Sequence, residues 1–285
     1  MARYSAMSSI AERYDRTADA YQRWWGPVLE PTALGVLGLV GPSIPDDGAG
    51  IHLLDIGTGT GALAVAAAER WPAIRVTGLD GSAGMLALAR RELHRRLGRA
   101  ADERVEFVTG RAERMPFADA SFDIAVSSFV LQLVPHRPRT LAETLRVLRP
   151  GGLLGFVTWR ASDTPFAPDE ALYEVLDELE IDDPEEPEEV RAGDFSSPAA
   201  AAAQLRRAGF RDVSAREQVL VHRYDPATYL DFLEQYAERG RFLGLDDRTA
   251  HEVRARTAER LARLPPDAFI WRAPVVSVRA RRPPR

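Results

Sequence analysis

Two acids and a run of glycines have the types and spacing of a nucleoside-binding site. The segment IHLLDIGTGTG (51–61) is a short apolar run that ends in Asp55 and is followed by three glycines at alternate positions, Gly57, Gly59 and Gly61. Glycine tolerates positive φ and lets a ligand approach the backbone where a Cβ would collide. Asp80 follows nineteen residues after Gly61, at the carboxyl end of a predicted strand. A carboxylate at that place in an α/β sheet accepts hydrogen bonds from ribose hydroxyls.

Three interpretations of the glycine turn compete. A dinucleotide site expects G-x-G-x-x-G, but here the third glycine comes one residue early, and only a degenerate match remains at Gly59, Gly61 and Ala64. A P-loop requires a lysine after its last glycine, and the sequence contains no lysine. The third interpretation is a D-x-G-x-G-x-G turn in which Asp55 closes the strand. A plain tight turn in a fold core is the alternative that the downstream residues must exclude.

With its downstream residues, the turn resembles that of class I S-adenosylmethionine-dependent methyltransferases. The family pattern Asp-x-Ser-x-x-Met-Leu is met at residues 80–86, and Leu-Arg-Pro-Gly-Gly-Leu-Leu precedes the predicted strand at 153–159. Enzymes similar to the ubiquinone/menaquinone C-methyltransferases often begin with Tyr-Asp-x-x-Ala-x-x-Tyr. Residues 14–21 match that pattern. The resemblance covers residues 14–159 and implies that the cofactor is S-adenosyl-L-methionine, with S-adenosyl-L-homocysteine as its product.

The resemblance also implies where each part of the cofactor lies. Relatives read Gly-Asp-Ala-Glu at residues 110–113, and their Asp binds the adenine amino group. Here Arg111 stands in its place and has donors only. Either Glu113 or a carbonyl accepts from the amino group, or Arg111 stacks or points to solvent. The expected cofactor-binding residues are Tyr14, Tyr21, Asp55, Gly57, Thr58, Gly59, Gly61, Asp80, Gly81, Ser82, Met85, Arg111, Ala112, Glu113, Ser127 and Ser128.

The elements that must position these residues alternate between strand and helix. This order predicts an α/β fold, namely a doubly wound, Rossmann-like sheet of seven strands with the last one antiparallel. A helical cap precedes the sheet, and a helical insert follows its fifth strand. We expect a single methyltransferase domain over residues 1–285. Its parts are a cap (1–48), a cofactor-binding core (49–160), an acidic lid insert (161–195) and a C-terminal part of the sheet with helices (196–285).

Local signals predict details within these parts. Gly26-Pro27 predicts a break after the first helix. Thr140 and Glu143 have the spacing of a capping box, which predicts a helix beginning there. The acidic run at 182–189 predicts a charged, solvated loop.

Composition excludes several classes of function. There are no cysteines, and the five histidines are scattered, so no metal site is expected. The net charge of −5 argues against a nucleic-acid partner. The start lacks the apolar core of a signal peptide, and no apolar run approaches the ~20 residues of a membrane span. We therefore expect a cytoplasmic protein, either monomer or homodimer.

Together these features predict an enzyme that transfers a methyl group to a small organic acceptor by in-line displacement, mainly through proximity and orientation. The aromatic residues Tyr21, Trp24 and Trp25, and the region of Phe129 and Trp159, suggest a partly apolar, aromatic or polyketide-like acceptor. His136 is the catalytic candidate if a general base is used, although a loop position before a helix also explains it. The alternatives are a non-catalytic S-adenosylmethionine-binding protein and an NAD(P)-dependent oxidoreductase.

Overall fold

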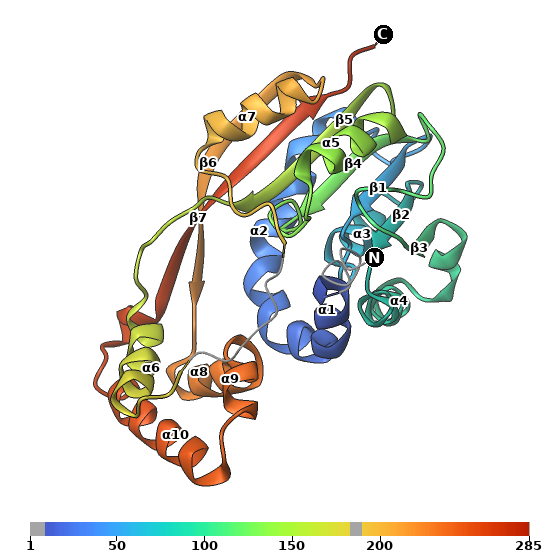
Figure 1. The fold of residues 1–285 in the computed structure, drawn as a ribbon. Helices are drawn as coiled ribbons and strands as arrows, with labels where there is room; N and C mark the ends of the chain where they lie inside the picture. Colours follow the sequence, from blue (N-terminus) through green and yellow to red (C-terminus); the bar gives the residue numbers. More distant parts are fainter. Residues whose placement is uncertain (1–8, 183–189, 285) are drawn as a thin grey trace, which may run out of the picture.

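The computed structural model describes residues 9–182 and 190–284, which form a seven-stranded sheet with helices on both faces (Figure 1). The predicted charged loop therefore falls almost wholly outside the described residues. The strands are β1 (His52–Ile56), β2 (Arg75–Asp80), β3 (Val105–Thr109), β4 (Phe122–Ser128), β5 (Leu148–Trp159), β6 (Arg211–Arg223) and β7 (Ile270–Arg281). Their spatial order is β3-β2-β1-β4-β5-β7-β6. Because β7 runs antiparallel to both of its neighbours, the predicted doubly wound sheet with an antiparallel last strand is confirmed.

Helices connect these strands and extend the chain at both ends. The α-helices are α1 (Ser9–Ala20), α2 (Gly26–Val40), α3 (Ala62–Arg70), α4 (Ala83–Leu97), α5 (Arg137–Val147), α6 (Ala167–Glu178), α7 (Pro198–Arg207), α8 (Pro226–Phe232), α9 (Arg239–Leu243) and α10 (Asp247–Leu261). Two π-helical turns occur, η1 (Tyr21–Trp25) and η4 (Leu233–Ala237), with 3₁₀ turns at η2 (Gly41–Ser43), η3 (Arg99–Glu103) and η5 (Pro266–Phe269).

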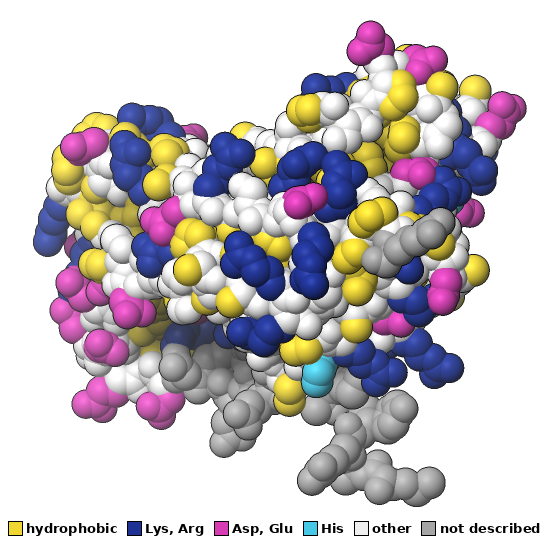
Figure 2. Space-filling model, turned by 90° about the horizontal axis from the view of Figure 1, so that it is seen from above, with side chains coloured by type: hydrophobic (Ala, Val, Ile, Leu, Met, Phe, Trp, Pro, Cys, Tyr) yellow, Lys and Arg dark blue, Asp and Glu magenta, His cyan; other side chains and the backbone are white. Residues whose placement is uncertain are grey.

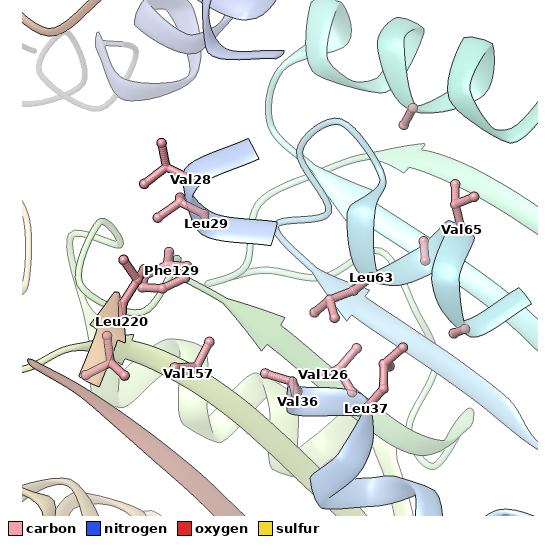
Figure 3. Packing of buried hydrophobic residues seen from close by; sticks show 14 of the residues in the cluster. Val28, Leu29, Val36, Leu37, Leu63, Val65, Val126, Phe129, Val157 and Leu220 are labelled. Carbon is pink, nitrogen blue, oxygen red and sulfur yellow. The ribbon is translucent and has the colours of Figure 1, made fainter. Parts of the chain in front are cut away.

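Apolar side chains cover both faces of the sheet. On one face, α2 and α3 place Val36 and Leu63 against Val126 of β4 and Val157 of β5 (Figure 3). On the other face, α5 packs onto β5, and α7 packs onto β6 and β7, through a separate apolar cluster. Burial of an apolar side chain of this size stabilises the fold by about 1.5–3 kcal/mol. The carboxyl ends of the parallel strands are thereby held rigidly at one edge of the sheet.

A small helical lobe projects from the antiparallel edge. The first residues of β7, Ile270–Pro274, pair with β6 alone among the described strands, so the two strands continue as a ribbon beyond β5. Helices α6, α8, α9 and α10 gather at the far end of this ribbon (Figure 1). The lobe also returns to the N-terminal cap, because Phe232 of α8 stacks on Trp25 at a ring distance of 6.0 Å.

Two local predictions about helices are wrong. The chain remains helical through Gly26, because η1 joins α1 directly to α2 and Pro27 occupies the first turn of α2, where its missing N–H is not needed. The predicted capping box is also absent. Helix α5 begins at Arg137, and Nδ1 of His136 accepts the cap bond from the Arg139 N–H. Thr140 is instead buried inside the helix.

Charge is unevenly distributed over the surface. Seen from above, several arginine side chains lie across the middle of one face, and most acidic side chains lie toward its edges (Figure 2). The chain as a whole nevertheless carries a net charge of −5. No helix among the described residues is long and apolar enough to cross a membrane.

Candidate active site

A cavity of about 650 Å³ opens at the carboxyl ends of β1, β2 and β4, within the range of about 300–1,000 Å³ usual for ligand sites. Helix α1 forms one of its walls, and the loops after β3 and β4 form others. Most of the predicted cofactor residues line this cavity: Tyr14, Tyr21, Gly57, Gly59, Asp80, Gly81, Met85, Arg111, Ala112, Glu113 and Ser128. The structure thus brings together residues that lie more than 100 positions apart.

The glycine turn after β1 has the backbone that its sequence predicts. Gly57, Gly59 and Gly61 have φ values of 69°, 54° and 88°, in the left-handed region. The N–H groups of Gly57 and Thr58 both donate to the Leu79 carbonyl, at 2.7 and 2.9 Å, which fixes the turn against β2. A Cβ on Gly57 would lie 2.3 Å from a methyl carbon of Val130, whereas one on Gly59 would meet nothing within 4 Å.

This difference predicts unequal effects of alanine at the two positions. Both substitutions place a Cβ in a left-handed conformation, which costs roughly 1–2 kcal/mol. Gly57→Ala also forces Val130 to move, and overpacking of this kind adds about 1–3 kcal/mol. We expect urea denaturation to show the larger loss for Gly57→Ala. Equal losses for the two variants would contradict the close contact with Val130.

Asp55 and Asp80, the two acids that lie beside the glycine turn in the structure, have different environments. Asp80 lines the cavity, and its two oxygens accept from the N–H groups of Gly59 and Ser82, at 2.8 and 2.9 Å. Burial raises the pKa of Asp80, although these N–H groups favour its charged form. Asp55 is buried behind the turn and accepts from the Thr58 hydroxyl at 2.7 Å. Its burial raises its pKa to about 7. Asp80 is therefore the acid that can reach a ligand, and Asp55 supports the turn.

Helix α1 is fastened beside Asp80 by the acid of the Tyr-Asp pattern. Asp15 Oδ1 accepts from the Ser82 hydroxyl and from the Gly84 N–H, each at 2.6 Å. Close packing at Gly84 explains the small residue there, because a Cβ would lie 3.0 Å from the same oxygen. The attachment keeps the two tyrosines in the cavity wall, where the rings of Tyr14 and Tyr21 meet edge to face at 5.9 Å.

The attachment of α1 through Asp15 should weaken at low pH. The Ser82 hydroxyl and then the Gly84 N–H lower the pKa of Asp15 below its ordinary 3.8. A depressed pKa contributes stability that is present above the unfolded-state value and is lost as pH falls through the folded-state value. We expect Asp15→Asn to lower Tm at pH 7, and the difference from the wild type to shrink below about pH 4. Asp163→Asn, at an exposed site, is the control. A difference that persists unchanged at pH 3 would contradict this role.

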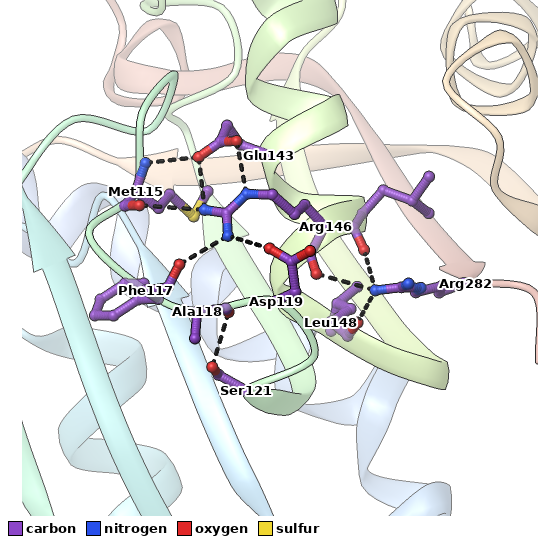
Figure 4. Close-up of polar contacts among 10 residues, drawn as sticks. Met115, Phe117, Ala118, Asp119, Ser121, Glu143, Arg146, Leu148 and Arg282 are labelled. Carbon is purple, nitrogen blue, oxygen red and sulfur yellow. Dashed lines mark hydrogen bonds and ion pairs between the residues drawn. The ribbon is translucent and has the colours of Figure 1, made fainter.

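The loop after β3 is held from behind by an arginine on α5. Arg146 donates to the carbonyls of Phe117 and Met115 at 2.7 and 3.2 Å, and Glu143 pairs with Arg146 and accepts from the Met115 N–H at 2.8 Å (Figure 4). The loop is thereby fixed at several points just after Glu113. Arginine and glutamate at these positions thus support the cavity from outside it.

The same loop presents an acceptor to the cavity. The Glu113 side chain is 11% exposed, and its Oε2 lies 3.7 Å from Nε of Arg111. Oε1 is buried and has no hydrogen-bond partner within the described part of the chain. Because an unpaired buried carboxylate oxygen is costly, this atom is suited to accept a bond from a ligand. It is the main evidence that the residues fit a nucleoside with an exocyclic amino group.

Some predicted residues lie outside the cavity wall. Ser82 caps α4, and the Ser127 hydroxyl donates to the Ile56 carbonyl at 2.8 Å. The others that do not line the cavity are Asp55, Thr58 and Gly61. His136 caps α5 and is not in the wall either, and no histidine is found among the described lining residues. Likewise, no group of acids and histidines suited to a metal ion occurs in the described ranges.

A further part of the wall lies beyond the predicted cofactor-binding residues, where the sequence predicts the acceptor. Trp25, Phe129 and Trp159 form an aromatic side, with the Phe129 and Trp159 rings 4.4 Å apart. The last residues of the insert at 161–195 contribute Arg191 and Asp194. Its backbone bonds to the loop after β4, where the Gly193 N–H donates to the Gln132 carbonyl at 3.0 Å. No local motif marks this segment, because it reaches the cavity only through the fold.

Comparison with known proteins places the core of this chain in a family. Residues 54–156 match the model of the methyltransferase domain. The ubiquinone/menaquinone biosynthesis C-methyltransferase UbiE of Paracoccus denitrificans is 38% identical over 151 residues, 53% of this chain and 56% of that protein. The malonyl-acyl-carrier-protein O-methyltransferase of Serratia marcescens is 40% identical over 157 residues, 55% of this chain and 52% of that protein. The match thus spans about half the length of these curated relatives.

Solved structures agree on the fold. Phosphoethanolamine N-methyltransferase 2 of Haemonchus contortus, in complex with phosphomonomethylethanolamine and S-adenosylhomocysteine, has a TM-score of 0.59 at 18% identity and covers 98% of this chain and 60% of that one. The cyclase SpnF has the same TM-score at 22% identity, and the match covers 97% of this chain and 96% of that one. The strand order, the glycine turn and the matched region lead to one assignment. Residues 54–156 form the part of this chain that matches a methyltransferase domain.

Proposed function

We propose that this protein is an S-adenosylmethionine-dependent methyltransferase acting on a small organic acceptor. The observation that carries the proposal is the unpartnered Glu113 Oε1 in the same cavity as Asp80 and the glycine turn. These groups suit the adenine amino group, the ribose hydroxyls and the close approach of a ligand to the backbone. The curated relatives named above transfer methyl groups to carbon or to oxygen, which supports the reaction class and leaves the acceptor atom open.

The protein's part in the reaction is to align two reactants and to exclude water. When bound, S-adenosylmethionine supplies a methyl group already activated by its sulfonium. The acids Asp80 and Glu113 favour a cationic ligand, and helix α1 covers it. Asp80 and Glu113 would hold this ligand, and Trp25, Phe129 and Trp159 would orient the acceptor toward it, with the acceptor's proton leaving to water. Orientation of this kind can contribute up to about 7–11 kcal/mol.

We propose an apolar, aromatic or polyketide-like acceptor for the remaining part of the cavity. Trp25, Phe129 and Trp159 give that part an apolar wall of tilted aromatic rings. Asp194, close to the end of the 161–195 insert, also lines this part of the cavity, and burial raises its pKa. We also propose that the chain acts as one domain, with residues 1–48 as a cap and 161–195 as part of the acceptor site.

Calorimetric titration with S-adenosylhomocysteine tests the proposal, with NAD as the parallel ligand. Micromolar binding of the first and none of the second is expected. Binding of NAD alone would favour an oxidoreductase and overturn the proposal. If S-adenosylhomocysteine binds, methyl transfer to demethylmenaquinol and to malonyl-acyl-carrier protein comes next. Binding without transfer to any of a broad acceptor panel would favour a non-catalytic binding protein, or chemistry of another kind on the same fold.

A further inference from the structure

The cavity wall contains a strained backbone corner. Phe129, the first residue after β4, has a φ of 54°. A left-handed conformation is rare for an aromatic residue, and sparsely populated conformations of this kind cost about 1–3 kcal/mol and cluster at ligand sites. The other non-glycine residues with positive φ in the described ranges are Ala120, Glu180 and Asp212, and none of them lines the cavity.

Buried hydrogen bonds hold this corner in place. The Gln132 side-chain nitrogen donates to the Phe129 carbonyl at 2.7 Å, and the Thr158 hydroxyl donates to the Gln132 side-chain oxygen at 2.6 Å. The Phe129 N–H donates to the Val157 carbonyl at 2.9 Å. Gln132 is 5% exposed and Thr158 is fully buried. The amide is satisfied at both ends, so Thr158 fixes Gln132, and Gln132 fixes the Phe129 peptide.

The corner lies where the amino-acid end of a bound cofactor is expected. The strands are adjacent in the order β3, β2, β1, β4, about 4.8 Å apart. Glu113 follows β3, Asp80 ends β2, and the glycine turn follows β1, so adenine and ribose occupy the first part of this row. The remaining amino-acid end of the ligand then points to the end of β4. Val130, the next residue, packs on Gly57 and joins the corner to the turn.

We propose that Gln132 is a positioning residue for the cofactor. Together with Thr158, Gln132 holds Phe129 in its left-handed conformation. This conformation directs the Ser128 backbone toward the ammonium group in the methionine part of the cofactor. The inference rests on the proposed function. Gln132 lies at the acceptor end of the cavity, but its proposed role is to position the methyl donor.

Two ligands that differ only in the methionine part test this role. S-adenosylhomocysteine has the amino-acid group, and 5′-methylthioadenosine lacks it. We expect Gln132→Leu, similar in size but without hydrogen bonds, to raise the Kd for S-adenosylhomocysteine about tenfold. The Kd for 5′-methylthioadenosine should change less than about twofold. Thr158→Val should act in the same direction, because Gln132 then loses its anchor.

A matched control separates positioning from loss of stability. The Thr144 hydroxyl donates to the Thr140 carbonyl at 2.8 Å inside α5, away from the cavity, and is equally buried. Thr144→Val should lower Tm and leave both affinities unchanged. If Gln132→Leu fails to fold, Thr158→Val decides. Equal weakening of both ligands, or no weakening of either, would overturn the inference. A wild-type protein that binds neither ligand would instead overturn the proposed function, and this inference with it.

Discussion

Asp80→Ala is expected to raise the Kd for S-adenosylhomocysteine by about 100-fold or more. The variant loses the acceptor for the two ribose hydroxyls, and hydrogen bonds to a charged group are each worth about 1.5–3 kcal/mol. It also releases the N–H groups of Gly59 and Ser82, which the two Asp80 oxygens hold in place. The glycine turn and the start of α4 are therefore less ordered before the ligand arrives. Calorimetric titration measures the effect directly.

A second acid provides the control for this prediction. Asp225 accepts from the Ala227 N–H at 3.0 Å at the start of α8, outside the cavity lining. Asp225→Ala removes a similar cap and should leave the affinity unchanged. Asp80→Asn keeps one acceptor oxygen and should give an intermediate loss. An unchanged Kd for Asp80→Ala would remove Asp80 from the site.

Glu113→Ala is expected to raise the same Kd about tenfold or more, because the adenine amino group loses a charged acceptor. The sharper result concerns selectivity. S-inosylhomocysteine carries a carbonyl oxygen where adenine has its amino group, so it offers an acceptor in place of a donor. The wild type should reject it, since Glu113 Oε1 can only accept. Glu113→Gln supplies a side-chain donor and should bind S-inosylhomocysteine better than the wild type does.

Arg111 provides a variant with the opposite expectation. Arg111→Asp restores the residue that relatives have at this place, and it should preserve or improve the affinity for S-adenosylhomocysteine. A large loss would mean that Arg111 contacts the ligand itself. If the wild type binds S-adenosylhomocysteine and S-inosylhomocysteine equally well, that result would contradict amino-group recognition by Glu113.

Patterns within a few residues were sufficient to predict much of the architecture. Apolar runs closed by Asp55 and Asp80 predicted strands, and the alternating glycines predicted a tight turn with positive φ, because these preferences are properties of the residues themselves. Helices α7 and α8 start in the same local way, because Ser197 and Asp225 each precede a proline and accept the cap bond through their side chains. The box at Thr140 failed since the burial of that residue outweighed its local preference.

The sequence by itself thus determined the sheet, the turn and the kind of ligand that the turn admits. Only the tertiary structure decided which side chains hold the site together. Asp15 meets Gly84 across 69 positions, and Thr158 meets Gln132 across 26. The sequence left Glu113 as one of several possible acceptors, and only the structure shows its Oε1 buried without a partner among the described residues, in a loop that Arg146 fixes. Such contacts depend on burial and on segments that are distant in sequence lying side by side, and the spacing of neighbouring residues encodes neither.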